Sequence, residues 1–119
     1  MIPYEEVILE HWRNPRNKGR LPAPDVDVVE ANPLCGDVIR LQLEVRDGRV
    51  KDVRFDGRGC AISQAAASLL TEMIKGKTIP DLKGFSDQEL LTALGGVVKT
   101  RLSCALLPLR ALKKALSSL

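Results

Sequence analysis

The amino-acid sequence predicts an α+β fold, in which helices pack on one small antiparallel sheet of about three strands. Apolar and polar residues alternate from Ile39 to Val45, and Asp47-Gly48 follows as a strong hairpin turn. Apolar residues at helical spacing mark two later stretches, 63–77 and 105–119. Strands that are followed by a run of helices are typical of α+β proteins.

The N-terminal part is expected to hold one helix and one short strand. The helix is amphipathic and covers residues 3–12, with Val7, Ile8 and Trp12 on its apolar side. Residues 14–25 contain three prolines and a glycine, which predicts an irregular connector. A short strand, VDVVEA, is expected over 26–31.

The hairpin is the clearest local signal in the chain. Its first strand places a row of apolar side chains on one buried face, namely Ile39, Leu41, Leu43 and Val45. The return strand carries Val50, Val53 and Phe55. The step from Val50 to Val53 breaks the alternation, which predicts a β-bulge or a late start of this strand.

Capping residues predict where the next two helices begin and end. The long helix SQAAASLLTEMIKGK is expected to have Ser63 as its N-cap and Gly76 as its stop. Ser86 and Glu89 have the spacing of a capping box, which predicts a second helix that ends at Gly95-Gly96.

The last helix is expected to begin near Cys104 and to run to the C-terminal region. Its apolar stripe consists of Leu106, Leu109, Leu112 and Leu116. Pro108 lacks an N–H group and is tolerated in the first turn of a helix, which is the reason for placing the start near Cys104.

Composition narrows the class of protein. A chain of 119 residues is expected to form one domain over 1–119, and 45% apolar with 28% charged residues is ordinary for a globular protein. The net charge of +3 comes from basic residues interspersed with acids, and aromatics are only 3%, so a nucleic-acid partner is not expected. No apolar run is long enough to span a membrane and the N-terminus does not resemble a signal peptide, so a cytoplasmic location without membrane contact is expected.

The three cysteines all fall at predicted element ends, where functional residues concentrate. Cys35 lies in a turn with Pro33 and Gly36, Cys60 in a glycine-rich loop before the long helix, and Cys104 at the start of the last helix. An odd count disfavours a disulfide framework and favours thiols in a reducing compartment. The positive end of a helix favours a thiolate, the form that binds metal or attacks sulfur.

Two interpretations of these cysteines remain open on the residues alone. They are either three small buried side chains, or three thiolates that with one more ligand form a tetrahedral zinc site or hold one Fe–S cluster. Asp37 is the fourth candidate, because it lies two residues from Cys35 in an extended segment; the alternative is a surface or turn aspartate. His11, the only histidine, is expected to serve packing or hydrogen bonding rather than to bind metal.

The motifs around these residues resemble a known family, the U-type iron–sulfur cluster assembly scaffolds IscU, SufU and the N-terminal domain of NifU. CGDVIRLQLEV, GRGCAISQAAASLLTEMIKGK and RLSCALLPL look like its three cysteine motifs, and HWRNPRNKG looks like its N-terminal signature. The resemblance covers nearly the whole chain and implies a SufE/NifU-like fold. It also implies that Cys35, Cys60 and Cys104 bind the cluster or metal and that Asp37 joins them.

Two positions depart from the IscU branch. Ser103 stands where that branch has a histidine before the third cysteine, and GGVVKTR replaces its LPPVK-like segment, which argues against recognition by the dedicated chaperone. Both departures resemble the SufU branch, as does Arg101 three residues before the cysteine. The interval between Cys60 and Cys104, however, has the compact IscU length and lacks the SufU insertion.

The resemblance therefore implies two functions. The first is a scaffold without turnover of its own, which receives sulfur from a cysteine desulfurase, assembles a [2Fe–2S] cluster and passes it to apo Fe–S proteins. The alternative is a zinc-dependent sulfurtransferase of the SufU type, in which Arg101 or Asp37 exchanges with a cysteine at the metal and Cys104 is a candidate sulfur acceptor. A purely structural zinc module is a third possibility. Zn²⁺ is expected in protein purified in air, because it binds such a site tightly and is redox-inert.

Overall fold

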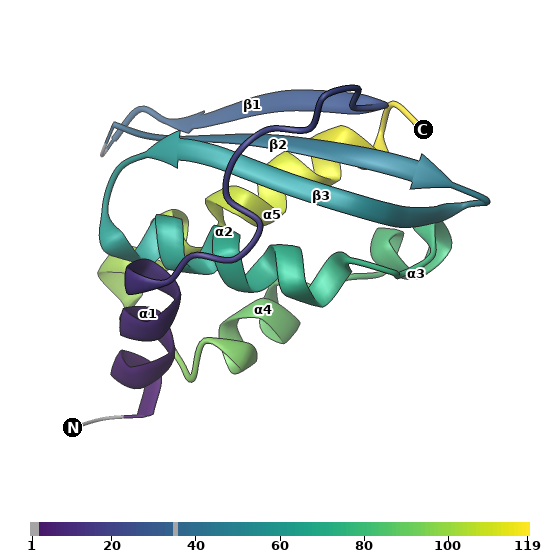
Figure 1. The fold of residues 1–119 in the computed structure, drawn as a ribbon. Coiled ribbons are helices and arrows are strands. Elements are labelled where there is room, and N and C mark those ends of the chain that lie inside the picture. Colours follow the sequence, from purple (N-terminus) through teal and green to yellow (C-terminus); the bar gives the residue numbers. More distant parts are fainter. Residues whose placement is uncertain (1–2, 35) are drawn as a thin grey trace.

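The fold is a three-stranded antiparallel sheet with helices packed on one of its faces, as Figure 1 shows. This computed structural model describes the backbone of residues 3–34 and 36–119 and the side chains of 6–34 and 36–119. The strands β1 (Val26–Asn32), β2 (Asp37–Arg46) and β3 (Arg49–Arg58) lie in the order β1-β2-β3. The predicted α+β class is confirmed.

The β2–β3 hairpin forms as its sequence predicts. Asp47 and Gly48 both have positive φ angles, 53° and 73°, as a tight turn between twisted antiparallel strands requires. The register shifts between Glu44 and Val45, where Lys51 of β3 is left without a partner in β2. The predicted break in alternation is therefore a β-bulge.

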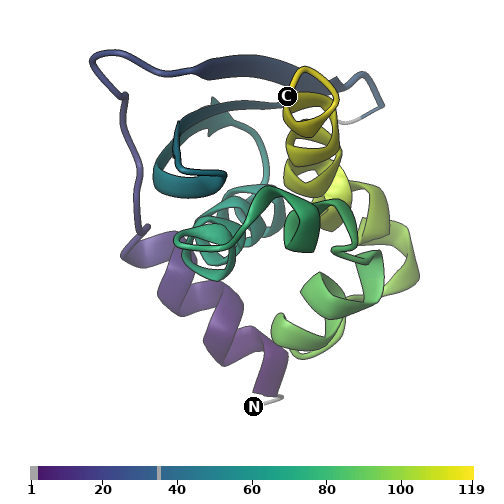
Figure 2. The same cartoon turned by 90° about the vertical axis from the view of Figure 1, so that its right-hand side faces the viewer.

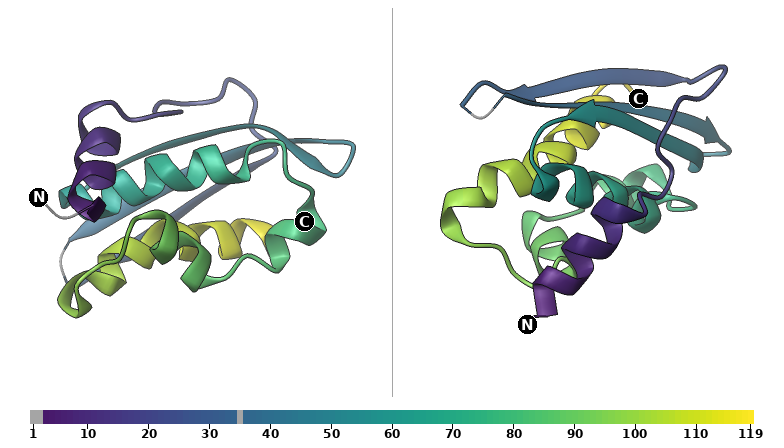
Figure 3. Two further views of the ribbon diagram at one scale, coloured as in Figure 1. Left: turned by 90° about the horizontal axis from the view of Figure 1, so that it is seen from below. Right: turned by 60° about the vertical axis from the view of Figure 1, so that its left-hand side comes forward.

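Two helices cover the inner face of the sheet. α2 (Ala61–Ile74) packs on β3 and β2, and α5 (Leu102–Leu116) packs beside it on β1 and β2 (Figures 1 and 3). The inward side chains of β2 are almost fully buried between them: Ile39, Leu41 and Leu43.

The remaining helices form an outer layer. α1 (Pro3–Arg13) packs on α2, whereas α3 (Ile79–Lys83) and α4 (Asp87–Ala93) pack on α5, so that Figure 2 shows them on opposite sides. Within the described part of the chain, no helix is both long enough and apolar enough to span a bilayer.

The connector between α1 and β1 protects one edge of the sheet. The Phe55 N–H of β3 donates to the Asn17 carbonyl, and the Gly19 N–H donates to the Phe55 carbonyl, both at 2.9 Å. At the opposite edge, Lys114 of α5 donates to the Val29 carbonyl of β1 at 3.0 Å. Covered edges of this kind disfavour pairing with other chains.

Three predicted helix details are wrong. α2 begins two residues before Ser63, whose hydroxyl donates to the Cys60 carbonyl at 3.1 Å instead of capping the helix. α5 begins at Leu102, directly after the 3₁₀ turn η1 (Lys99–Arg101), so Pro108 lies in its second turn rather than its first. Trp12 is 51% exposed, because α1 turns His11 towards α2 in its place.

Other helix ends follow their local signals. Ser86 accepts from the Glu89 N–H at 3.2 Å, which confirms the predicted N-cap of α4, and Gly76 has a φ of 85° just after α2. The short helix α3 was not predicted from the sequence. Its signal is Thr78, whose hydroxyl accepts from the Asp81 N–H at 3.2 Å.

Candidate metal centre

Three side chains from three separate elements meet at one end of the sheet. Asp37 is the first residue of β2, Cys60 is the N-cap of α2, and Cys104 is the third residue of α5. A carboxylate oxygen of Asp37 and the two sulfur atoms lie within 4.8 Å of one another. Among residues 6–34 and 36–119, these are the only three potential metal ligands that come together in this way.

Asp37 fixes the start of α2 as well as facing the thiols. Its side chain is 1% exposed, and its Oδ1 accepts from the Cys60 N–H at 2.8 Å. The Cys60 thiol donates to Oδ2 at 3.6 Å. A carboxylate at the N-terminus of a helix is favoured by the helix dipole, so Asp37 does for α2 what a capping side chain would do.

Two glycines allow the end of β3 to approach β2 this closely. A β-carbon on Gly59 would overlap the Asp37 carboxylate, and the φ of 138° at Gly59 is a conformation that favours glycine. A β-carbon on Gly57 would overlap the Val38 carbonyl. The GRG sequence before Cys60 is therefore a steric requirement of the site.

The two described cysteines differ in exposure. Cys104 is 2% exposed, whereas Cys60 is partly exposed. Pro108 follows Cys104 by four residues and has no N–H to donate to the Cys104 carbonyl, so the helix ladder is interrupted at the cysteine-bearing turn.

Cys35, the remaining predicted ligand, lies outside the described residues. On either side of it, Asn32 holds the loop between β1 and β2. Asn32 Oδ1 accepts from the Leu34 N–H at 3.1 Å, and the Asn32 carbonyl accepts from the Gly36 N–H at 2.9 Å. Asn32 also donates through Nδ2 to the Ser103 hydroxyl at 3.2 Å.

Sequence reasoning did not identify Asn32 as part of the site. The available signal was the Asn-Pro pair, which is typical of a turn start. That signal explains the loop but not the contact with Ser103, since the contact joins residues far apart in the chain.

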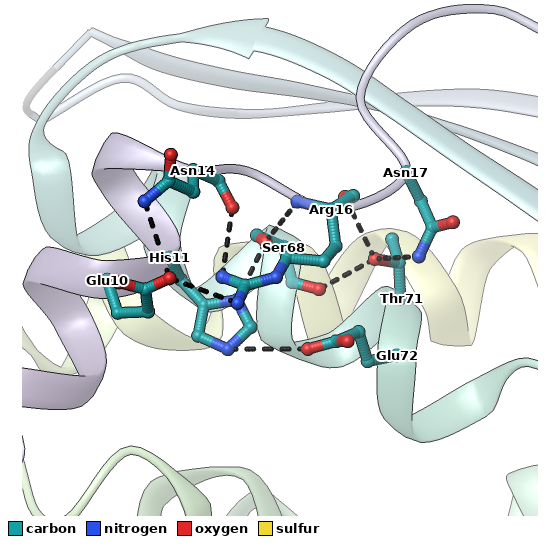
Figure 4. A network of polar contacts seen from close by, with 8 residues as sticks. All are labelled: Glu10, His11, Asn14, Arg16, Asn17, Ser68, Thr71 and Glu72. Carbon is teal, nitrogen blue, oxygen red and sulfur yellow. Dashed lines mark hydrogen bonds and ion pairs between the residues drawn. The ribbon is translucent and has the colours of Figure 1, made fainter.

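His11 belongs to a polar network between α1 and α2 (Figure 4). Its Nδ1 lies 2.8 Å from the Ser68 hydroxyl and its Nε2 lies 3.4 Å from Glu72. Burial lowers the pKa of His11, and nearby Arg16 lowers it further, against the opposing charges of Glu72 and Glu10. The expectation that His11 serves hydrogen bonding is confirmed.

The contacts favour one direction of donation. The Ser68 hydroxyl accepts from the Arg16 N–H at 2.8 Å, and its own hydrogen can be donated to His11 Nδ1. We infer a neutral imidazole with its proton on Nε2, directed towards Glu72.

The donor set suits a metal that prefers sulfur. Thiolates select Zn²⁺ and Fe–S clusters, and a carboxylate is an acceptable but harder ligand for either. Ligand atoms around a tetrahedral Zn²⁺ are about 3.8 Å apart when Zn–S is about 2.3 Å. The separations of up to 4.8 Å at this site therefore need only a small inward movement.

Comparison with known proteins agrees with this geometry. Residues 3–119 match the model of the NifU-like N terminal domain. The iron–sulfur cluster assembly scaffold protein IscU 1 of Archaeoglobus fulgidus is 36% identical over 113 residues, which cover 95% of this chain and 74% of that protein. The zinc-dependent sulfurtransferase SufU of Bacillus subtilis is 41% identical, with 96% of this chain and 89% of that protein covered.

Solved structures show the same architecture. The crystal structure of the N-terminal part of a nitrogen-fixing NifU-like protein from Brucella abortus superposes with a TM-score of 0.80 and 25% sequence identity, covering 96% of this chain and 92% of that one. The expected NifU-like fold is therefore confirmed. Because the family model spans almost the whole chain and relatives share more than a third of its residues, this chain belongs to the NifU-like N-terminal domain family.

Proposed function

We propose that this protein is a scaffold on which a [2Fe–2S] cluster is assembled and from which it is transferred. The observation that carries the proposal is the convergence of Asp37, Cys60 and Cys104 from three elements at one end of the sheet. Cys35 completes the ligand set by its resemblance to the family motif. The cluster is cargo in this scheme, and its sulfur comes from a cysteine desulfurase.

Sulfur enters the site by exchange between two thiols. A thiolate of the site, with Cys104 as the candidate, attacks the terminal sulfur of a persulfide on the desulfurase. The S–S bond of that persulfide breaks, the desulfurase cysteine leaves as a thiolate, and the persulfide is now on the scaffold. No electrons are gained or lost overall in this transfer.

Asp37 supports the release of the cargo. A carboxylate is a harder and more exchangeable ligand for iron in a cluster than a thiolate. One of its oxygens already accepts from the Cys60 N–H, so the carboxylate keeps a partner when the cluster departs. The apo site is thereby held together between two rounds of loading.

A zinc-dependent sulfur acceptor is the second candidate, because a relative that is 41% identical carries that activity in its name. Arg101 precedes α5 in an exposed position three residues before Cys104, where it is available for exchange at a metal. Against this candidate, the alignment with that relative runs over 133 positions, more than this chain has residues. The relative therefore has segments with no counterpart here, and we place the scaffold first.

Anaerobic reconstitution tests the proposal. Metal-free protein is incubated with ferrous iron, L-cysteine, a cysteine desulfurase and dithiothreitol, which reduces persulfide sulfur to sulfide, and the visible spectrum is followed. We expect the absorption of a [2Fe–2S] cluster, its loss in Cys60→Ser and Cys104→Ser, and its transfer to an apo-ferredoxin. Zinc-loaded protein that accepts sulfur while the metal-free form builds no cluster would instead establish the sulfurtransferase.

Partners and location follow from the proposed function. We expect a cysteine desulfurase and apo Fe–S proteins as partners and a cytoplasmic location. A protein that bound neither a desulfurase nor an Fe–S acceptor in pull-down with the purified candidates would contradict the scaffold.

A further inference from the structure

We propose that Asn32 and Ser103 form a bridge that positions the loop around Cys35 against the cysteine-bearing turn of α5. This inference rests on the proposed function and assigns it two positioning residues. The bridge is the hydrogen bond from Asn32 Nδ2 to the Ser103 hydroxyl, at 3.2 Å. Neither residue is a proposed ligand of the site. Ser103 precedes Cys104, and Asn32 bonds to Leu34 and Gly36, the two neighbours of Cys35.

Asn32 is placed to control the geometry of the loop. It is 3% exposed and ends β1, opposite Asp37 at the start of β2. Its side-chain oxygen accepts from the Leu34 N–H and its carbonyl accepts from the Gly36 N–H, so both neighbours of Cys35 are held by this one residue. The same side chain then uses its amide group to reach Ser103.

Ser103 is placed to control the other side of the site. It immediately precedes Cys104, in the first turn of α5. Among the described residues, no side chain caps this helix by a hydrogen bond, and Pro108 cannot donate to the Cys104 carbonyl one turn later. The Ser103 hydroxyl is therefore a polar link between this turn and the end of β1.

The link matters because a four-ligand site tolerates little misplacement of its ligands. Asp37 and Cys60 are already joined by the hydrogen bond to the Cys60 N–H. The Asn32–Ser103 bond provides the matching connection between the loop at Cys35 and the turn at Cys104. Partners that orient metal ligands typically change metal affinity by about 10- to 100-fold when they are removed.

Co²⁺ binding to the purified chain tests the bridge, since its d–d absorption reports tetrahedral coordination and its titration gives an affinity. We expect Ser103→Ala and Asn32→Ala each to weaken Co²⁺ binding by about tenfold and to distort the d–d bands. The double variant should bind little worse than Asn32→Ala, because either change alone already breaks the bond. Ser103→Thr, which keeps the hydroxyl, should restore the parent affinity.

The chain offers a matched control for the loss of such a bond. Gln88 donates to the Thr92 hydroxyl at 3.0 Å on exposed α4, so Thr92→Ala removes an amide-to-hydroxyl bond away from the site. Thermal unfolding of each variant tests whether the fold is kept, and we expect it to be. We expect Thr92→Ala to bind Co²⁺ like the parent.

The outcomes separate the bridge from the proposed function. A parent protein that binds Co²⁺ but builds no cluster would contradict the scaffold, while the variants still test the bridge. Ser103→Ala with the parent's affinity and spectrum would overturn the bridge alone. A parent that binds neither Co²⁺ nor cluster would overturn both.

Discussion

At the residue scale, Asp37 combines a structural and a chemical task in one carboxylate. One oxygen accepts from the Cys60 N–H at the start of α2, and the other lies 3.6 Å from the Cys60 sulfur. A substitution to alanine removes both interactions, whereas asparagine keeps an acceptor for the N–H and removes the charge. The pair of variants therefore separates the two tasks.

We expect Asp37→Ala and Asp37→Asn to slow release of a reconstituted [2Fe–2S] cluster several-fold. Both remove a hard, exchangeable ligand and a negative charge that repels the departing anionic cluster, and both leave the three cysteines in place. The measurement is the rate of transfer to an apo-ferredoxin, with zinc content determined on the same samples. A difference in transfer rate between the two variants measures the effect of the bond to the Cys60 N–H. Faster cluster loss from the variants than from the parent would refute a labile-ligand role for Asp37.

Gly59→Ala is expected to damage the site although it replaces no ligand. Its methyl group would overlap the Asp37 carboxylate, and alanine is strained at a φ of 138°. Strain of this kind costs about 1–3 kcal/mol. We expect lower unfolding free energy in denaturant and weaker Zn²⁺ binding.

Gly84→Ala is the control for this substitution, because a β-carbon there meets only the Asp81 carbonyl at an ordinary 3.6 Å. Equal metal affinity in Gly59→Ala and the parent would show that Asp37 does not need its present position.

At the element scale, α1 is held on α2 by polar contacts as well as by apolar packing. His11 contacts both Ser68 and Glu72 of α2, and the Arg16 N–H after α1 donates to the same Ser68 hydroxyl (Figure 4). α2 in turn carries Cys60 at its N-cap. The attachment of α1 is therefore linked through one helix to the metal centre.

This attachment predicts a pH-dependent stability near neutrality. The pKa of His11 is lowered in the folded protein by burial and by Arg16, so the unfolded chain binds more protons below pH 6.5. The His11 contribution is complete above about pH 6.5 and is lost as pH falls towards the folded pKa. Each unit of lowering is worth about 1.4 kcal/mol.

Urea unfolding between pH 7.5 and 5.5 measures this effect. His11→Asn keeps an acceptor near the Nδ1 position and does not titrate, and the chain has no other histidine. We expect the parent to lose stability over this range and His11→Asn to lose less. Parallel pH profiles for the two proteins would show that His11 protonation is not linked to folding.

At the scale of the whole molecule, the site joins the two layers of the fold. β2 belongs to the sheet, and α2 and α5 are the helices that cover it; each contributes one side chain to the group of three. A bound metal therefore adds a link between elements that are otherwise connected by apolar packing and by the Cys60–Asp37 hydrogen bond. Metal binding and folding should be coupled for this reason.

We expect Zn²⁺ to raise the melting temperature and a chelator to reverse the change. At a free metal concentration 100 times the dissociation constant, binding adds about 2.7 kcal/mol. For a chain of this size that corresponds to roughly 10 °C. Calorimetry with and without EDTA measures the shift.

Cys60→Ser and Trp12→Ala provide the comparison. Cys60→Ser removes a proposed ligand and should lose most of the rise in melting temperature that Zn²⁺ causes. Trp12 is 51% exposed on α1, so Trp12→Ala should leave that rise unchanged. A parent protein whose melting temperature does not respond to Zn²⁺ would contradict a metal centre at the junction of these layers.

The sequence by itself determined the features that depend on near neighbours in the chain. Alternation placed Ile39, Leu41 and Leu43 on the buried face of β2, and Asp47-Gly48 set the hairpin, because side-chain direction and turn type are local properties. The capping residue of α4 was predicted for the same reason. The family motifs named the cysteines and Asp37 as a group.

Only the tertiary structure decided how distant residues meet. The bond from the Cys60 N–H to Asp37 and the bond from Asn32 to Ser103 join residues 23 and 71 positions apart, and no local pattern encodes them. The apolar periodicity of α1 predicted that Trp12 is buried, but His11 is the residue that packs against α2. The two residues are adjacent at the edge of the apolar face, and periodicity alone does not decide which of them is buried. Side-chain direction repeats along an element and is visible in the sequence, whereas the contacts of a site depend on how whole elements pack.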